Sequence, residues 1–138
     1  MHNCSTVIIH CMDFRLINKI REWVDQNNLT NDTDIISIAG ASKALSEDNK
    51  EIQNFILNQI NVSYLLHNAR KVILMHHSDC GAYGSYNFID EEEEFAKQLE
   101  DMGIAEEIIK NSFDDIEVQK VWIQMNDHEG RNVEFINL

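Results

Sequence analysis

Two short clusters of side chains in this sequence are suited to metal and proton chemistry. The first is CMDFR at residues 11–15, and the second is HSDC at residues 77–80. Two thiolates and one imidazole form a soft, nitrogen-containing donor set that suits zinc, and the two-residue gap between His77 and Cys80 lets one tight turn present both. We therefore expect Cys11, His77 and Cys80 to hold one Zn²⁺ ion per chain.

A set of three protein ligands leaves one coordination position of the zinc open. An open position is typical of catalytic rather than structural zinc, because water bound there can have its pKa lowered to about 7. Asp13 and Arg15 alternate with Cys11, so all three side chains share one face if this stretch is extended. Asp13 could then accept a hydrogen bond from the bound water while Arg15 grips the carboxylate through two contacts. Asp13 is also close enough in sequence to ligate the metal itself, and both arrangements stay open.

Each cluster directly follows a predicted strand. Residues 6–10 and 71–76 are short apolar runs with the character of strands buried on both faces. In an open parallel sheet, ligands bind beyond the carboxyl ends of the strands. We therefore expect the two clusters to meet at one edge of a sheet.

The remaining segments alternate between the two kinds of periodicity. Residues 35–38 predict another buried strand, and the small residues 39–42 after it, like Gly81, let the backbone approach a ligand, so Gly40 and Gly81 are substrate-binding candidates. Apolar residues at helical spacing predict four helices, at residues 16–28, 46–67, 90–102 and 104–110. The second should be the longest, with Ser46 as its N-cap. Gly103 separates the last two.

The end of the sequence predicts a hairpin of strands at residues 118–125 and 133–136. Strands alternating with helices indicate an α/β fold, and residues 1–138 should form one domain. We expect three layers, in which helices flank a central, mostly parallel β-sheet that ends in a C-terminal antiparallel edge hairpin.

Length, composition and charge limit the classes of function. A chain of 138 residues with 43% hydrophobic and 25% charged residues is typical of one globular domain. Its net charge of −13 disfavours nucleic acid and anionic membranes as partners. No apolar stretch is long enough to span a membrane, and residues 1–6 lack a charged segment leading into an apolar core. The odd number of cysteines, three, does not suit a secreted disulfide framework, so we expect a cytoplasmic protein.

Cys11-x-Asp13-x-Arg15 followed by His77-x-x-Cys80-Gly81 resembles the signature of the β-class carbonic anhydrases. An Ala39-Gly40 pair lies between the two motifs, as in that family, and the C-terminal hairpin also fits. The resemblance implies a zinc lyase that hydrates CO2 to bicarbonate, a small-molecule substrate. It also implies that Cys11, His77 and Cys80 are the ligands, that Asp13 and Arg15 form a catalytic dyad, and that a homodimer or higher homo-oligomer is the working unit.

The sequence departs from the family pattern in two places. The family usually has Arg-Asn before its Ala-Gly pair, where this chain has Ser37-Ile38, and the first predicted strand begins too early for the family's N-terminal helical arm. Three interpretations follow: a minimal carbonic anhydrase, a hydrolase of carbonyl sulfide or carbon disulfide on the same site, or a catalytically silent zinc-binding homologue. A thiol redox protein is a weaker alternative because the chain has no C-x-x-C motif.

Several other reactive residues have a plainer interpretation. His76 and His10 neighbour the expected ligands, but strand alternation sends adjacent side chains to opposite faces, so we expect both to be structural. Cys4 is an incidental thiol on this view. The acidic run at residues 90–94 predicts a solvated helix start, and Asp79 is expected to bond turn amides. Tyr83 and Tyr86 could equally line the pocket or pack.

Overall fold

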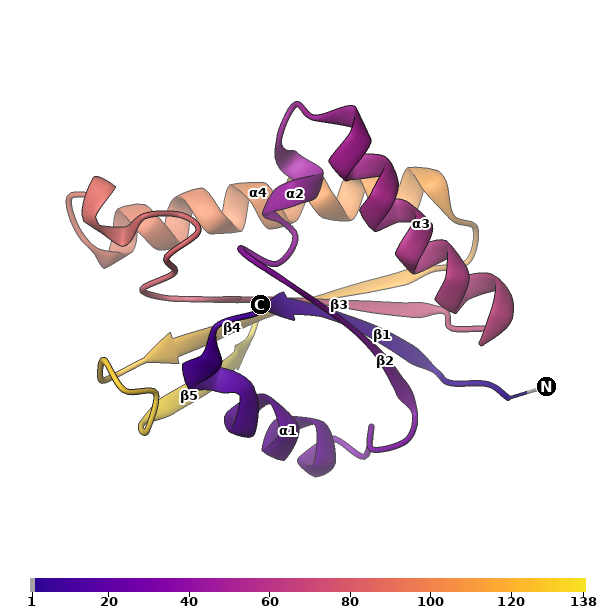
Figure 1. Ribbon diagram of the computed structural model, residues 1–138, viewed down its shortest axis with the longest axis horizontal. Coiled ribbons are helices and arrows are strands. Elements are labelled where there is room, and N and C mark those ends of the chain that lie inside the picture. The colour runs from indigo at the N-terminus through magenta and orange to yellow at the C-terminus, as the bar shows by residue number, and fades with distance from the viewer. Residues whose placement is uncertain (1) are drawn as a thin grey trace.

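The computed structural model describes residues 2–138 and contains one five-stranded sheet with the order β2-β1-β3-β4-β5 (Figure 1). The first four strands in this order run parallel, and β5 is antiparallel to β4. This confirms the predicted mostly parallel sheet with a C-terminal antiparallel edge. The strands are β1 (Thr6–Cys11), β2 (Thr33–Ile38), β3 (Lys71–His77), β4 (Glu117–Met125) and β5 (Val133–Asn137).

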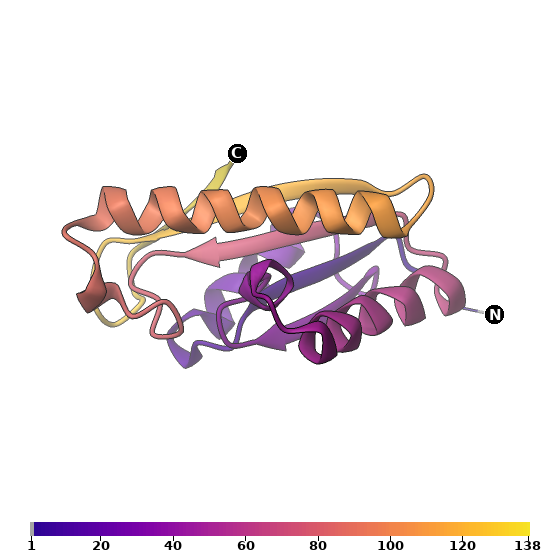
Figure 2. The ribbon, with the colours of Figure 1, turned by 90° about the horizontal axis from the view of Figure 1, so that it is seen from above.

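Helices cover both faces of the sheet, which completes the three predicted layers (Figures 1 and 2). On one face lies α1 (Ile17–Gln26), preceded by the short 3₁₀ helix η1 (Phe14–Leu16). The other face carries α2 (Lys43–Ser46), α3 (Lys50–Leu66) and α4 (Glu91–Ser112), and the 3₁₀ helix η2 (Ser85–Asn87) precedes α4. Within residues 2–138, no helix combines the length and the apolar character needed to cross a bilayer.

The alternation of side chains along β1, β3 and β4 produces two separate apolar cores. The core under α3 and α4 contains Val7, Ile9, Val72, Leu74, Ile56, Ile60, Met102 and Ile109. The core under α1 contains Ile8, Ile73, Met75, Val121, Ile123, Leu16, Ile20 and Trp23. Burial on both faces fixes β1 and β3 as the central strands whose carboxyl ends carry the two reactive clusters.

The prediction that residues 35–38 form a strand buried on both faces is wrong. β2 is an edge strand that pairs only with β1, and its residues alternate between half-buried and exposed positions. Ile35 is 48% exposed. A short run such as IISI has the same composition at an edge as in the centre of a sheet, so its sequence alone did not distinguish the two.

The prediction of two helices separated at Gly103 is also wrong. The two segments form one helix, α4, which has 22 residues and is longer than the 17-residue α3. A glycine within a helix costs only about 1 kcal/mol, and the burial of Met102, Ala105 and Ile109 outweighs that cost. Ser46 ends α2, whereas α3 is capped by Asn49, whose side chain accepts a hydrogen bond from the Ile52 amide.

We expect Gly103→Ala to raise the free energy of unfolding by about 0.5–1 kcal/mol, because alanine has less conformational freedom to lose on folding. A Cβ atom at this position would have no neighbour within 4 Å. Urea denaturation measures the change. Gly130→Ala is the contrasting control: its φ is +74° and a Cβ would lie 2.5 Å from the Arg15 carbonyl oxygen, so it should destabilise. Destabilisation by Gly103→Ala would mean that α4 is interrupted there.

Candidate metal centre

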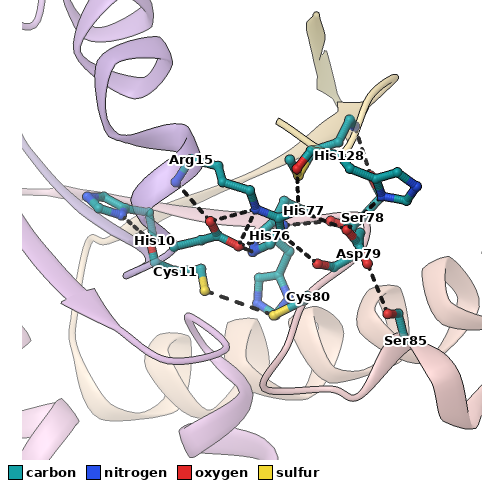
Figure 3. A network of polar contacts seen from close by, with 12 residues as sticks. His10, Cys11, Arg15, His76, His77, Ser78, Asp79, Cys80, Ser85 and His128 are labelled. Atoms are coloured by element: carbon teal, nitrogen blue, oxygen red, sulfur yellow. Dashed lines mark hydrogen bonds and ion pairs between the residues drawn. The ribbon is translucent and has the colours of Figure 1, made fainter. Parts of the chain in front are cut away.

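The carboxyl ends of two neighbouring strands bring the reactive clusters together. Cys11 is the last residue of β1 and His77 is the last residue of β3, which lies beside β1 in the sheet. The turn after β3 returns Cys80, whose sulfur lies 3.9 Å from the sulfur of Cys11 (Figure 3). The donor atoms of Cys11, His77 and Cys80 all lie within 4.8 Å of one another, and all three residues are buried. The expected meeting of the two clusters is therefore confirmed.

The imidazole of His77 is arranged to offer one free ring nitrogen. Its Nδ1 lies 2.6 Å from the carbonyl oxygen of Ser78, an acceptor, so Nδ1 carries the proton. The Nε2 atom then has a lone pair, yet within the described chain it is buried without a hydrogen-bond partner. An unpaired buried nitrogen is costly unless another atom uses its lone pair. This nitrogen and the two sulfurs fit the donor set of a zinc ion.

Cys11, His77 and Cys80 also shift one another's pKa values. The hydrogen bond between the two sulfurs lowers the pKa of the Cys11 thiol and raises the pKa of Cys80. Burial is the largest single influence on the pKa of His77 and lowers it, but the contacts with Cys11, the Ser78 carbonyl oxygen and Asp13 together raise the pKa above its ordinary value. The centre therefore concentrates negative charge on a buried sulfur, which a divalent cation would stabilise by replacing the shared protons.

Asp13 and Arg15 adopt a different backbone from the predicted extended one. β1 ends at Cys11, and Asp13 caps η1, where its Oδ1 accepts a hydrogen bond of 2.9 Å from the Arg15 amide. The Arg15 side chain donates from Nε to Oδ1 at 3.0 Å and from Nη2 to Oδ2 at 2.7 Å. The predicted two-pronged contact is therefore present, although a helical turn rather than strand alternation produces it.

The Asp13 carboxylate lies beside the three candidate metal ligands. Its Oδ2 is 3.8 Å from Nε2 of His77. The hydrogen bonds from Arg15 are the main cause that holds the pKa of Asp13 below its ordinary value. Asp13 is consequently an ionised acceptor at neutral pH, directed at the space beside the ligand nitrogen.

Asp79 makes a contact that the sequence did not reveal. We expected its side chain to bond turn amides; instead its Oδ2 accepts a hydrogen bond of 2.8 Å from Nη1 of Arg15 and its Oδ1 accepts one from Ser85 (Figure 3). Its carbonyl oxygen accepts a further bond of 3.0 Å from Nη2. The carbonyl oxygen of His128, in the turn between β4 and β5, accepts a bond from Nη1. All five N–H donors of Arg15 thus have acceptors within the protein.

Two residues of α4 hold the turn that carries His77 and Cys80. Glu94 is buried and accepts hydrogen bonds from the amides of Asp79 and Cys80, at 2.9 and 3.2 Å. Gln98 donates to the His77 carbonyl oxygen at 2.9 Å and to Glu94. The prediction of a solvated acidic helix start is therefore wrong for Glu94. Glu94, Gln98 and Asp101 share the buried helix face, and this spacing was the available signal.

The neighbouring histidines point away from the three donors. Nε2 of His76 accepts from Ser42, and its Nδ1 donates to the Gln98 side-chain oxygen at 2.9 Å. Burial lowers the pKa of His76 to about 4. His10 donates to the carbonyl oxygen of Cys11. Both contacts are structural ones, as strand alternation predicted.

The tyrosines after the second motif differ from each other. Tyr83 is buried in one cluster with Cys11 and Cys80, and its hydroxyl donates to Asp101 of α4 at 2.7 Å. Tyr86 is 87% exposed. Neither tyrosine lines the cavity described next.

A cavity of about 680 Å³ opens onto the candidate metal centre. Gly81 lines this cavity, whereas Gly40 does not. A Cβ atom on Gly40 would approach Ala82 and Lys43 to 3.1–3.2 Å. Met12 and Phe14, also on the wall, are 63% and 85% exposed. The cavity is lined by Cys11, Met12, Asp13, Phe14, Arg15, Ala39, Asp79, Gly81, Ala82 and His128.

Comparison with known proteins assigns the chain to a family. Residues 1–134 match the family described as "Putative carbonic anhydrase". An uncharacterized protein of Rickettsia conorii is 32% identical over 123 residues, which are 86% of this chain and 66% of that protein. The chain thus spans about two thirds of that relative's length.

Solved structures agree with the family assignment at the level of the fold. A carbonic anhydrase from Streptococcus mutans is similar with a TM-score of 0.61 at 19% identity, covering 99% of this chain and 83% of that chain. The β-carbonic anhydrase of Aspergillus fumigatus gives 0.56 at 10% identity, covering 99% and 76%. The sequence match places this chain in the "Putative carbonic anhydrase" family, and its fold is similar to that of the β-carbonic anhydrases.

Replacing Glu94 with glutamine should weaken zinc binding about 10–100-fold, because the new amide N–H₂ group would face the donors that the carboxylate now accepts from. Competition with a chelator of known affinity measures the change. Glu92→Gln, an exposed neighbour on the same helix, should bind zinc as the wild type does. Equal affinities for the two variants would contradict the assigned role of Glu94.

Proposed function

We propose that this protein is a zinc-dependent carbonic anhydrase, a lyase that catalyses the reversible hydration of CO2 to bicarbonate. One observation carries the proposal: a buried set of two sulfurs and an unpartnered imidazole nitrogen lies beside an ionised carboxylate at the wall of a cavity. Membership of the carbonic anhydrase family supports it.

Cys11, His77 and Cys80 would hold one Zn²⁺ per chain, and zinc there would supply hydroxide at neutral pH by acidifying water. Asp13 is the nearest carboxylate to the ligand nitrogen, so it would accept a hydrogen bond from that water and orient it. Because its pKa is lowered, Asp13 would stay ionised as a hydrogen-bond acceptor and would not hold the proton released by the water. That proton would then pass to solvent.

Arg15 acts on this arrangement through Asp13. All of its donors are already engaged by Asp13, Asp79 and the His128 carbonyl oxygen, so no N–H remains for a substrate. Arg15 therefore keeps Asp13 ionised and in one rotamer. Its grip on both carboxylate oxygens favours Asp13 as an oriented acceptor rather than as a fourth metal ligand.

The substrate is proposed at the level of small linear carbon species. CO2 is the proposed substrate because the family is that of the carbonic anhydrases. Hydrolysis of carbonyl sulfide or carbon disulfide by zinc-loaded protein that fails to hydrate CO2 would replace this proposal with the hydrolase. If zinc-loaded protein converts none of these three substrates, the protein is a catalytically silent zinc-binding homologue.

A homodimer is part of the proposal. Ile52 and Phe55 of α3 are exposed and line a second cavity that shares Ala39 and Ala82 with the cavity at the metal centre. With the exposed Met12 and Phe14, they form an apolar surface around the mouth of the centre. A second copy of the chain would cover this surface and complete the pocket wall.

The domain organisation and location are proposed on simpler grounds. One sheet collects strands from residues 6 to 137, which supports a single domain. The three cysteines are all free thiols, which supports a reducing compartment such as the cytoplasm.

We expect Asp13→Asn to retain one zinc at this centre but to lower the rate of CO2 hydration by about 10²–10⁴-fold, because an amide is a weaker acceptor and presents N–H groups to Arg15. Stopped-flow hydration by protein of verified zinc content measures the effect. Cys80→Ala should lose both this zinc and activity, and Asp25→Asn, an exposed carboxylate change on α1, should lose neither. Full activity in Asp13→Asn would contradict the role.

For the homodimer, Phe55→Glu should shift the mass measured by sedimentation equilibrium from two chains towards one, because the charge must be desolvated in the interface. Ile104→Glu places the same charge at an exposed site on α4 and should leave the mass unchanged. A monomeric wild type, or a dimeric Phe55→Glu variant, would exclude this interface.

A further inference from the structure

A second group of candidate metal-binding side chains lies at the other end of the parallel strands, where β1 and β2 begin. Cys4, Asp34 and His67 bring a sulfur, a carboxylate oxygen and a ring nitrogen within 4.8 Å of one another. The Asp34 Oδ2 atom lies 3.6 Å from the Cys4 sulfur and 2.6 Å from Nδ1 of His67. β1 separates Cys4 from Cys11 by its whole length, roughly 20 Å at the rise of a strand, so this group is independent of the first centre.

Three separate segments converge here, and the fold fixes their positions. Cys4 precedes β1, Asp34 is the second residue of β2, and His67 is the C-cap of α3. The Cys4 amide donates to the His67 carbonyl oxygen at 2.9 Å, and the parallel register pairs Val7 with Asp34. The donors are therefore preorganised by backbone contacts.

A buried hydroxyl beside the group lacks a partner. The Oγ atom of Ser63 has no hydrogen-bond partner among residues 2–138, and Ser63 is only 2% exposed. Ser63, Asp34 and His67 line the same cavity, of about 210 Å³. A water molecule on a metal ion in this cavity would give the Ser63 hydroxyl the partner that it lacks.

His2 lies where it could support His67 as a metal ligand. The Nε2 atoms of the two rings lie 3.1 Å apart. Nδ1 of His67 lies 2.6 Å from the Asp34 carboxylate and so carries the proton in the metal-free protein. A bound metal ion would displace that proton, and Nε2 of His67 would then donate its own proton to His2. Metal-bound histidines commonly donate their other ring N–H to an acceptor in this way.

We propose that Cys4, Asp34 and His67 form a second Zn²⁺ site, with Ser63 hydrogen-bonded to a water in the fourth position. A thiolate, an imidazole and a carboxylate are the ligand types that zinc accepts, and the two anions neutralise the ion. The bound ion would join the segment before β1 to β2 and to the end of α3. Because β2 is an edge strand with a partner on one side only, this link would stabilise that edge of the sheet.

Metal content tests the proposal. Elemental analysis after equilibration with Zn²⁺ should find two zinc ions in the wild-type chain and one fewer in Cys4→Ser. Asp32→Asn removes a nearby carboxylate that contacts Ser5 and should bind as many as the wild type. Equal content in the wild type and Cys4→Ser, or an equal loss in Asp32→Asn, would overturn the site. Should the first centre bind no zinc, Cys4→Ser would still lose one, so the two proposals fail separately.

A spectroscopic measurement tests whether the Cys4 thiol is a ligand. Thiolate-to-Co²⁺ charge-transfer absorption should fall in Cys4→Ser relative to the wild type. It should persist in Cys11→Ser/Cys80→Ser, where Cys4 is the remaining thiol. His2→Gln should keep the stoichiometry but weaken zinc binding at this site about 10–100-fold. An unchanged cobalt spectrum in Cys4→Ser would overturn the site even if the double variant fails to fold.

Discussion

The guanidinium of Arg15 is the interaction on which the candidate centre depends. It joins the segment after β1 to the turn after β3, because Asp13 and Asp79 accept from the same group. The His128 carbonyl oxygen adds the β4–β5 turn to this network. A planar group with five fixed donors holds three segments in one relative position, which a flexible ammonium would not do. Without it, Asp13 would be free to rotate towards or away from the ligand nitrogen.

The second constraint comes from α4. This helix places Glu94, Gln98 and Asp101 on its buried face among apolar residues, and these polar groups bond to the turn carrying His77 and Cys80 and to Tyr83. Each buried polar group is therefore satisfied by the segment that it positions. The contacts that pack α4 against the sheet are consequently also the contacts that place the candidate metal ligands.

Local patterns predicted the central strands and the meeting of the two motifs, since strand burial and parallel order bring Cys11 and His77 to one edge. They missed Glu94 because hydrophobic periodicity counts only apolar residues, and this buried face is partly polar. They also divided α4 at Gly103, where tertiary packing outweighs local propensity. The edge position of β2 depends on partners distant in sequence, which composition does not encode.

The two sulfurs of the first centre are separated by 69 residues along the chain. They meet only after β3 has paired with β1, with α1, β2 and α3 already synthesised between them. A growing polypeptide that has left the ribosome only as far as α3 offers a single donor of this set. The full three-donor set therefore exists only once this long loop has closed, so the pairing of β3 with β1 completes the centre.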